Sequence, residues 1–287
     1  MRPQFNTPNH IYLLAASDRP MDLLSAIIIG LIQGITEWIP VSSTGHLVFA
    51  EQLLQMRSEE MVLFTLVLHA ATLMAVTFFL RKELIRIIPA MFRDKSKLDE
   101  EGARSRRLGW FALIATIPVA IAGIIESRFL EEIFSTALPT AVALLVTGAM
   151  LWVAETPSLR KERADLGFRD AMIIGCFQAI SVLPGISRSG STISAGCYLG
   201  FRRDVVAIFS FLLSIPAIIL ALAYGLAFLE DNQTDWTSTI VAAIVAGVTG
   251  VLALKWLFGL IQQRKLRWFA IYCWVVGIVA IALILVY

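Results

Sequence analysis

The sequence predicts an all-α integral membrane protein with six transmembrane helices and two re-entrant helix-loop-helix segments, arranged as an inverted-topology repeat. Three observations favour this fold class. The 287 residues are 57% hydrophobic and 16% charged, whereas soluble domains average about 45–50% apolar and about 25% charged residues. Apolar segments recur near the length of about 20 residues that crosses a bilayer, and polar motifs break two of them. Basic residues gather in only some of the connections.

The apolar segments follow one another along most of the chain. They cover 21–54, 61–80, 109–127, 137–155, 168–200, 205–229, 236–258 and 267–287. The first is interrupted by the motif PVSSTGH at 40–46 and the fifth by PGISRSGST at 184–192. Proline and glycine end helices, and hydroxyl groups satisfy the freed backbone groups, so we expect a helix, a break and a return helix in each.

A single membrane domain is expected over 21–287, with repeat halves at about 21–155 and 168–287. Residues 1–20 are rich in proline and polar residues and lack the basic start, apolar run and cleavage site of a signal peptide. We expect this extension to be disordered or to reflect a misassigned start, with Met21 as the initiator, which N-terminal sequencing of the native protein tests.

The two halves match each other at an offset of 145 residues, and the match continues through both breaks. The pairs are Gly30 with Gly175, Gln33 with Gln178, Ile35 with Ile180, Thr36 with Ser181, Val41 with Ile186, Ser42 with Ser187, Thr44 with Ser189 and Gly45 with Gly190. Shared composition would align leucines and isoleucines, but it does not align a glutamine and a Ser-x-Ser/Thr-Gly run. The pattern therefore predicts an internal repeat.

The charges of the connections predict how the halves lie in the membrane. The segment 81–108 carries nine Lys/Arg residues, and 156–169 and 259–267 are also basic, whereas 230–236 has no Lys or Arg. Basic connections stay in the cytoplasm, and these assignments agree only if each broken segment returns to its own side. Each half then has three crossings, which inverts one half relative to the other and brings the two breaks together near the midplane.

Arg188 lies deep within the second broken segment, where an unpaired charge is costly. It needs an anion, and its planar guanidinium can bind phosphate in a bidentate manner. Ser187, Ser189 and Thr192 add hydroxyl donors, and the helix expected after Gly190 adds free backbone N–H groups. The alternative is an arginine that only caps carbonyl groups of the broken helix.

The first break supplies a carboxylate and a second set of hydroxyl groups. Ser42, Ser43 and Thr44 open its return helix, and the alternative is that they only cap it. Glu37 is an ionisable group in a segment that cannot solvate it, so we expect it to hold a divalent cation or to act as a general base. A purely structural ion pair with Arg188 is the alternative.

Three further polar residues accompany these motifs. Gln33 is four residues before Glu37 and shares its helix face. His46 ends the first motif, and we expect it to shuttle a proton or to contact the substrate. His69 stands alone in an unbroken helix, where we expect a satisfied polar residue without a role in catalysis.

These motifs resemble those of the bacitracin-resistance family of undecaprenyl-diphosphate phosphatases. QGITE at 33–37 matches the family's (Glu/Gln)-x-x-x-Glu motif, the stretch 184–192 resembles its PGxSRSxxT signature, and 40–46 is similar to its P-(V/I)-S-S-(T/S)-G-H stretch. The resemblance implies six membrane helices with two re-entrant helix pairs, a multi-pass location in the bacterial inner membrane, and a site that opens to the outer, periplasmic side. It also implies dependence on a divalent cation, Mg²⁺ or Ca²⁺, and homodimers.

The resemblance also implies roles for individual residues. The family's catalytic serine falls on Ser43, its essential glutamate on Glu37 and its phosphate-binding arginine on Arg188. The residues expected to line the phosphate pocket are Ser42, Thr44, Ser187, Ser189 and Thr192. Many members have glutamate at the position of Gln33, and this departure puts in doubt a mechanism that needs two acidic metal ligands from this helix.

The predicted function is hydrolysis of the terminal phosphate of a C55 polyprenyl diphosphate, which yields the monophosphate carrier for cell-wall synthesis and inorganic phosphate. Ser43 is expected to attack the phosphorus, and direct attack by water is the alternative. The partners are then the lipid substrate and membrane lipids, and the net charge of +2 does not favour a nucleic acid. A flippase for a polyprenyl phosphate is the rival function, because inverted repeats are typical of transporters, but a flippase needs no nucleophile beside the arginine.

Overall fold

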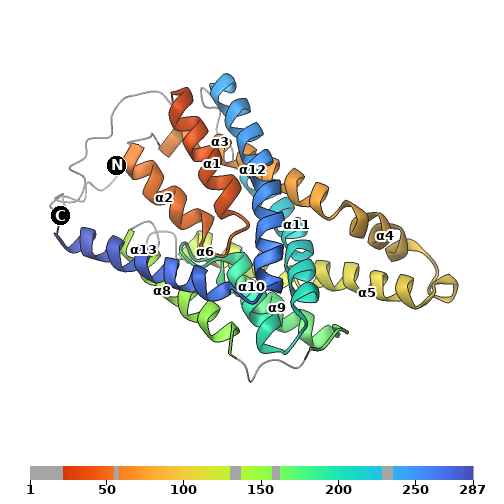
Figure 1. Cartoon of the computed structure of the whole chain (residues 1–287). Helices are drawn as coiled ribbons and strands as arrows, with labels where there is room; N and C mark the ends of the chain where they lie inside the picture. Colours follow the sequence, from red (N-terminus) through yellow and green to blue (C-terminus); the bar gives the residue numbers. More distant parts are fainter. Residues whose placement is uncertain (1–21, 55–57, 130–136, 157–161, 228–234, 287) are drawn as a thin grey trace.

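The computed structural model describes residues 22–54, 58–129, 137–156, 162–227 and 235–286 (Figure 1). The extension 1–20 and Met21 lie outside the described residues. Within them, the regular structure is helical, apart from an isolated bridge between Arg163 and Phe201. The helices are α1 (Leu23–Thr36), α2 (Ser43–Leu54), α3 (Ser58–Phe79), α4 (Arg81–Phe92), α5 (Glu100–Ile114), α6 (Ile117–Phe129), α8 (Ala137–Ala154), α9 (Phe168–Ile180), α10 (Arg188–Tyr198), α11 (Arg203–Ala227), α12 (Trp236–Gln262) and α13 (Leu266–Val286), with a 3₁₀ turn at Lys95–Lys97.

The described residues contain six helical stretches that are long and apolar enough to cross a membrane. These are Val62–Phe79, Glu100–Ile125, Ala137–Ala154, Arg203–Ala227, Trp236–Gln262 and Leu266–Val286. They coincide with the six unbroken apolar segments of the sequence, so the prediction of a six-span helical membrane protein is confirmed. Large apolar side chains on their outer faces, such as Ile244, Val248 and Leu252 of α12, are more than half exposed and suit contact with lipid.

The expected single segment 109–127 is divided between α5 and α6. Pro118 lies in the first turn of α6, where its missing N–H group is tolerated, but it cannot continue the hydrogen bonding of α5. The hydroxyl of Thr116 donates to the carbonyl of Ala112 across the join. A proline that was read as part of an apolar run therefore starts a new helix.

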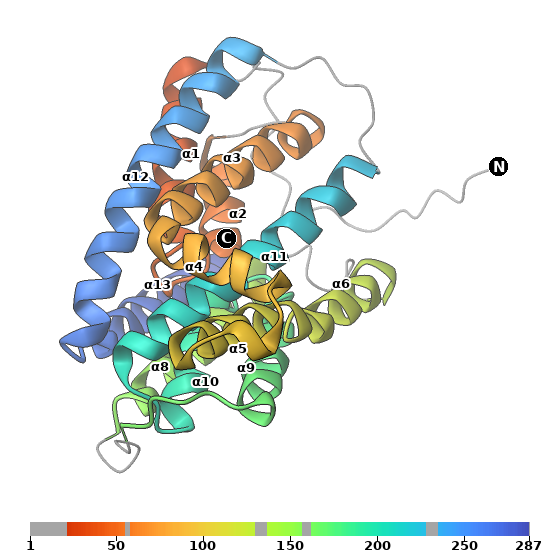
Figure 2. The same cartoon turned by 90° about the vertical axis from the view of Figure 1, so that its right-hand side faces the viewer.

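The basic connection 81–108 is mostly helical, although the sequence suggested only a connecting segment. In Figure 1, α4 and the start of α5 lie side by side and reach away from the other helices, and in Figure 2 they lie in front of them. Gly109 of α5 allows close packing, because a Cβ atom there would lie 2.4 Å from the sulfur of Met91 and 2.8 Å from Ile87. Arg86 and Glu101 form an exposed ion pair across this arm.

Both broken segments form a helix, a loop and a second helix, as α1 with α2 and α9 with α10. The loops cover 37–42 and 181–187. The second return helix begins at Arg188 and not after Gly190 as expected, because the Ser187 side chain accepts a hydrogen bond from the Gly190 N–H and so caps the helix three residues earlier. Arg188 consequently stands at the first helical position.

Glycine residues let the first helix of each broken segment, α1 or α9, pack closely against a membrane-spanning helix. A Cβ atom on Gly30 of α1 would lie 2.5 Å from the carbonyl oxygen of Ala242 in α12, and one on Gly175 of α9 would lie 2.4 Å from the carbonyl oxygen of Ala115 at the end of α5. Any larger residue at Gly30 or Gly175 would push the loop that follows it out of place.

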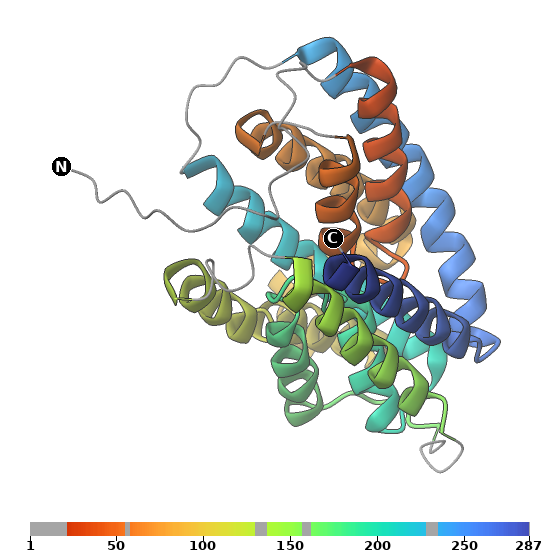
Figure 3. The same ribbon diagram turned by 90° about the vertical axis from the view of Figure 1, so that its left-hand side faces the viewer.

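Helices α8 and α13 lie side by side on the face of the molecule that is turned toward the viewer in Figure 3. Here too glycines make the contact, since Gly148 lies against Trp274 and Gly277 against the carbonyl oxygen of Ala141. The indole N–H of Trp274 donates to the carbonyl of Leu145 at 3.1 Å. This pair of helices forms a wall beside both return helices.

Candidate active site

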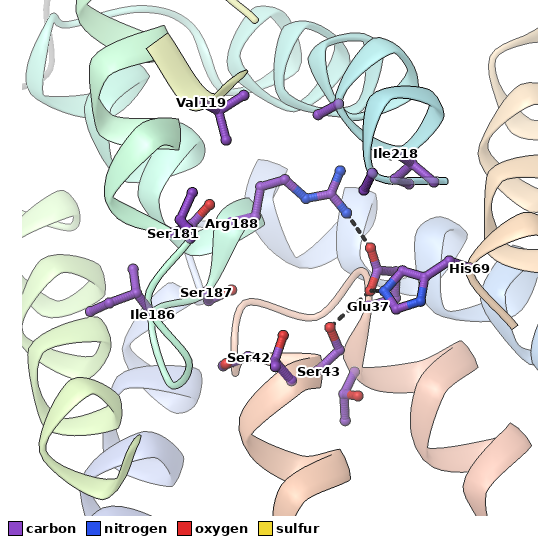
Figure 4. Close-up of a pocket in the computed structure, with 15 residues that line it drawn as sticks. Glu37, Ser42, Ser43, His69, Val119, Ser181, Ile186, Ser187, Arg188 and Ile218 are labelled. Atoms are coloured by element: carbon purple, nitrogen blue, oxygen red, sulfur yellow. Dashed lines mark hydrogen bonds and ion pairs between the residues drawn. The ribbon is translucent and has the colours of Figure 1, made fainter. Parts of the chain in front are cut away.

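The two loops meet at a pocket that is flanked by α3, α6 and α11 (Figure 4). Its polar lining consists of Thr36, Glu37, Ser42, Ser43, Thr44, His69, Ser181, Ser187 and Arg188. The opposite wall is apolar and includes Val119 of α6 and Ile218 of α11. The cavity measures about 170 Å³, which is below the roughly 300–1,000 Å³ of sites for drug-sized ligands, so it suits a small polar headgroup.

Glu37 is the centre of the polar lining. Its side chain is almost fully buried, and both carboxylate oxygens have partners. Oε2 accepts hydrogen bonds from the Ser43 hydroxyl at 2.8 Å and from the Gln33 amide at 3.1 Å, and Oε1 is paired with the Arg188 guanidinium. The His69 Nε2 lies 3.8 Å from Oε2. Ser43 and Arg188, which line the pocket, and Gln33 all donate to this one carboxylate.

Arg188 enters the pocket from the opposite loop. It is held on two sides, by Glu37 and by the carbonyl oxygen of Ser214 in α11, to which Nη1 donates at 3.2 Å. Pro216 lies inside α11 two residues further on, and a proline within a helix distorts the turn before it. The guanidinium therefore bridges the first loop and α11, with its charge neutralised by Glu37 in an environment that otherwise offers little solvation.

Ser43 is the first residue of α2, and its hydroxyl points at Glu37 (Figure 4). A serine at this position lies among backbone N–H groups that have no partner within the helix, which favours an anion nearby. Ser43 and Arg188 thus approach the same carboxylate from two return helices. The pocket combines a hydroxyl group, a carboxylate that accepts its hydrogen bond and a guanidinium, and groups of these kinds can transfer a phosphoryl group.

Comparison with known proteins agrees with this chemistry. The family model described as bacitracin resistance protein BacA matches residues 26–279, which is most of the chain. The chain belongs to this family.

Curated relatives of this BacA family member are named undecaprenyl-diphosphatase. One from Methanobrevibacter smithii is 39% identical over 270 residues, covering 90% of this chain and 96% of the relative. One from Christiangramia forsetii is 39% identical over 266 residues, covering 91% of this chain and 98% of the relative. One from Myxococcus xanthus is 35% identical over 267 residues, covering 92% and 90%. None of these three names describes a transporter.

The residues expected from the BacA motifs separate into two groups in the structure. Those that line the pocket are Glu37, Ser42, Ser43, Thr44, Ser187 and Arg188. Gln33, Ser189 and Thr192 lie behind it. Gln33 supports Glu37, Ser189 bonds the Ser187 hydroxyl at 3.2 Å, and Thr192 joins α10 to Ser210 of α11 at 2.6 Å.

The two histidines are arranged in the opposite way to the sequence-based expectation. His69 of α3 lines the pocket, whereas His46 turns away from it toward Tyr272 of α13. The reason is the set of bonds that the His46 ring makes, because a residue three positions after Ser43 lies near the same face of α2. The ring bonds the Ser42 carbonyl and Tyr272, while α3 passes the pocket at the level of His69.

Thr36, Ser181 and His69 also line the pocket, and the motif analysis assigned none of them to the site. A usable signal was present for the first two, because Thr36 and Ser181 are matched in the internal alignment and directly precede the breaks. For His69 the signal was an ionisable side chain within a membrane-spanning segment, which by itself marks a candidate functional residue.

A divalent cation was expected from the BacA resemblance, with Glu37 as its ligand. The described residues contain no group of three or more His, Cys, Asp or Glu side chains that could hold a metal ion. The donors that fit a hard cation are the Glu37 carboxylate and the Gln33 Oε1, a buried oxygen for which no hydrogen-bond partner is found among the described residues. Such a small donor set resembles a Mg²⁺ site that is completed by phosphate oxygens of the substrate.

Proposed function

We propose that this chain is an undecaprenyl-diphosphatase, which hydrolyses the terminal phosphate of a C55 polyprenyl diphosphate to the monophosphate carrier and inorganic phosphate. The observation that carries the proposal is the convergence of Ser43 and Arg188 on Glu37 in a pocket of headgroup size. The names of the relatives give the same reaction, and bacitracin resistance and cell-wall synthesis follow from it.

Substrate binding begins with an exchange of partners at Arg188. In the described state the guanidinium is paired with Glu37, so neither charge is left alone in the pocket. The terminal phosphate takes over part of the planar guanidinium, which binds phosphate in the same bidentate manner as carboxylate. The Glu37 carboxylate is then released from Arg188 but keeps its hydrogen bond with Ser43.

The chemical step uses Ser43 as nucleophile. Its oxygen forms a bond to the terminal phosphorus while its proton passes to Glu37 Oε2, at present 2.8 Å away, and the bridging P–O bond breaks to release the lipid monophosphate. Arg188 stabilises the charge on the transferring phosphoryl oxygens. Glu37 returns this proton to the leaving lipid monophosphate and is again a carboxylate. Water then attacks the phosphoserine, Glu37 accepts the water proton and passes it to the Ser43 oxygen as the P–O bond to Ser43 breaks, and inorganic phosphate leaves.

Glu37 and the free Gln33 Oε1 are the groups that would hold a divalent cation. When bound, a cation of this kind neutralises phosphate charge as a Lewis acid. Gln33 has a second task that needs no metal, because its amide N–H holds the Glu37 carboxylate from behind.

The proposed setting is the bacterial inner membrane, with two re-entrant segments in inverted halves and a site that opens to the periplasmic side. Two features support this orientation. The basic connections mark the cytoplasmic end of α11 at Arg203, and the pocket residues Ala217, Ile218 and Ala221 lie nearer its other end, Ala227. Labelling by an impermeant thiol reagent tests it, because a cysteine within 231–235 should react from outside and one near Lys97 should not.

The proposed partners include a second copy of the chain, and mass measurement of the detergent-purified protein tests this homodimer. The decisive experiment for function is phosphate release from undecaprenyl diphosphate by purified protein, with and without a chelator. We expect release that is lost in Ser43→Ala. Absence of release by the folded wild-type protein under all metal conditions would refute the proposal.

A further inference from the structure

The residue before the nucleophile has an unusual backbone. Ser42 has φ of +69°, in the left-handed region that residues other than glycine, asparagine and aspartate seldom adopt. The equivalent residue of the other half, Ser187, has an ordinary φ of −74°. A conformation of this kind is strained and persists only where neighbouring contacts hold it. Since Ser43 follows directly, whatever holds Ser42 also directs the nucleophile.

His46 supplies one of those contacts. Its Nδ1 lies 2.8 Å from the carbonyl oxygen of Ser42, and its backbone N–H donates to the same oxygen at 3.3 Å. A carbonyl oxygen can only accept, so Nδ1 carries the ring proton. Nε2 then has a lone pair, which accepts a hydrogen bond from the Tyr272 hydroxyl; the two heavy atoms are 2.8 Å apart. Both ring nitrogens of His46 are thus engaged away from the pocket.

The second half of the chain contains the same local bond without a histidine. Ser191 occupies the position equivalent to His46, 145 residues later, and its hydroxyl donates to the Ser187 carbonyl at 2.8 Å. Both side chains therefore bond the carbonyl of the residue four positions earlier at the turn into a return helix. This equivalence indicates that the position has a structural task in both halves.

What His46 adds is a connection to α13. Its ring is stacked on that of Tyr272 with centroids 5.6 Å apart and an interplanar angle of 10°. The next residue of α13, Cys273, also contacts the first loop, since its Sγ lies 3.7 Å from the Pro40 carbonyl oxygen. Two consecutive residues of α13 therefore brace the loop on both sides of its left-handed residue.

We infer that His46 and Tyr272 are positioning residues, which hold Ser42 in its left-handed conformation and so present the Ser43 hydroxyl to Glu37. This inference rests on the proposed phosphatase function with Ser43 as nucleophile. Tyr272 acts from a membrane-spanning helix and does not line the pocket. The pair adjusts the geometry of attack and takes no proton from the substrate.

The first test is Tyr272→Phe, which removes one hydroxyl and keeps the ring stacked on His46. We expect kcat for phosphate release to fall about fivefold with KM unchanged, because substrate binding by Arg188 is not altered. The matched control is Tyr198→Phe, which removes a similar hydroxyl bond, 2.7 Å to the Met150 carbonyl, and should leave kcat at the wild-type value. Equal kcat in Tyr272→Phe and wild type overturns the role of Tyr272.

The second test uses the serine that the other half already contains. His46→Ala should lower kcat by about 10- to 100-fold, whereas His46→Ser, which can restore the bond to the Ser42 carbonyl, should recover a large part of it. In the His46→Ser background Tyr272→Phe should have no further effect. A general acid or base at His46 predicts instead that serine is as inactive as alanine, and that result overturns the inference.

Failure of the inference and failure of the proposed function are distinguishable. If the wild-type protein releases no phosphate from undecaprenyl diphosphate, the function itself is wrong. If it does and all five variants, including the double variant, keep their melting temperatures in detergent, the ratios of kcat among them test the positioning role alone.

Discussion

The two broken segments have the same order of helix, loop and helix, yet they differ in burial and in chemistry. Residues 189–197 of α10 are all buried, and Ser187, Ser191 and Thr192 bond to each other's backbone or to neighbouring helices. At the start of α2, Thr44 is exposed and Ser42 is held in a strained conformation. The second segment holds Arg188 on a buried helix, and the first presents the Ser43 hydroxyl at the edge of a pocket.

Equivalent positions carry complementary groups. Ser43 corresponds to Arg188 at an offset of 145 residues, and Glu37 corresponds to Val182. The two segments bring a hydroxyl group with a carboxylate and a guanidinium to one pocket. Each segment therefore supplies a different part of the polar lining.

The largest effect is expected from the first segment. Ser43→Ala should lower kcat by about 10³-fold or more, since no other hydroxyl is bonded to Glu37 in the described residues. Steady-state phosphate release measures it, and Ser25→Ala at the start of α1 is a control with the same chemical change. Turnover near the wild-type rate in folded Ser43→Ala would move the mechanism to direct attack by water.

The corresponding change in the second segment is Arg188→Lys. Charge is retained but bidentate binding is lost, so we expect activity to fall by about 10²-fold. Arg203→Lys is a useful comparison, because Arg203 is also buried and paired, with Glu155 at 3.3 Å, but lies away from the pocket. Arg203→Lys should lower the melting temperature and leave kcat close to the wild-type value. If Arg188→Lys retained full activity, the second segment would have only a structural role.

The variant Glu37→Gln tests whether activity depends on the charge of this side chain and not only on its shape. It keeps the volume of the side chain and most of its hydrogen bonds but cannot accept a proton, so we expect a loss of about 10²-fold. Kinetics against metal concentration measure it, together with Gln33→Ala, which should keep a measurable fraction of activity. Gln33→Glu should remain active and tighten the apparent affinity for divalent metal. Equal losses in Glu37→Gln and Gln33→Ala would mean that both residues only pack the break.

The smallest change in kcat is expected for the two glutamines that match at the offset of 145 residues, Gln33 and Gln178. Gln33 donates to Glu37, whereas both amide atoms of the buried Gln178 have no hydrogen-bond partner among the described residues. Gln33→Met should lower kcat several-fold, because the carboxylate loses a donor. Gln178→Met should leave kcat unchanged and raise stability by about 1 kcal/mol, since it removes an unsatisfied polar group. Melting temperature and kcat of both variants check this, and a loss of activity in Gln178→Met would show that its amide has a partner in the working protein.

The sequence by itself determined the membrane class, the six spans, the positions of both breaks and the main residues of the pocket. These depend on local properties. Apolar runs of membrane length must enter lipid, proline and glycine must break them, and Glu37 and Arg188 cannot remain unpaired in such surroundings. Their pairing across 151 residues follows from the cost of burying either charge alone.

Only the tertiary structure decided which side chains face the pocket. His69 points into it and His46 away from it, because a side chain's direction depends on the bonds that it makes and on the helix beside it. The bracing of Ser42 from α13 also depends on contacts between distant segments. Sequence patterns show that a polar residue in a membrane needs a partner, but the packing of helices determines which partner is within reach.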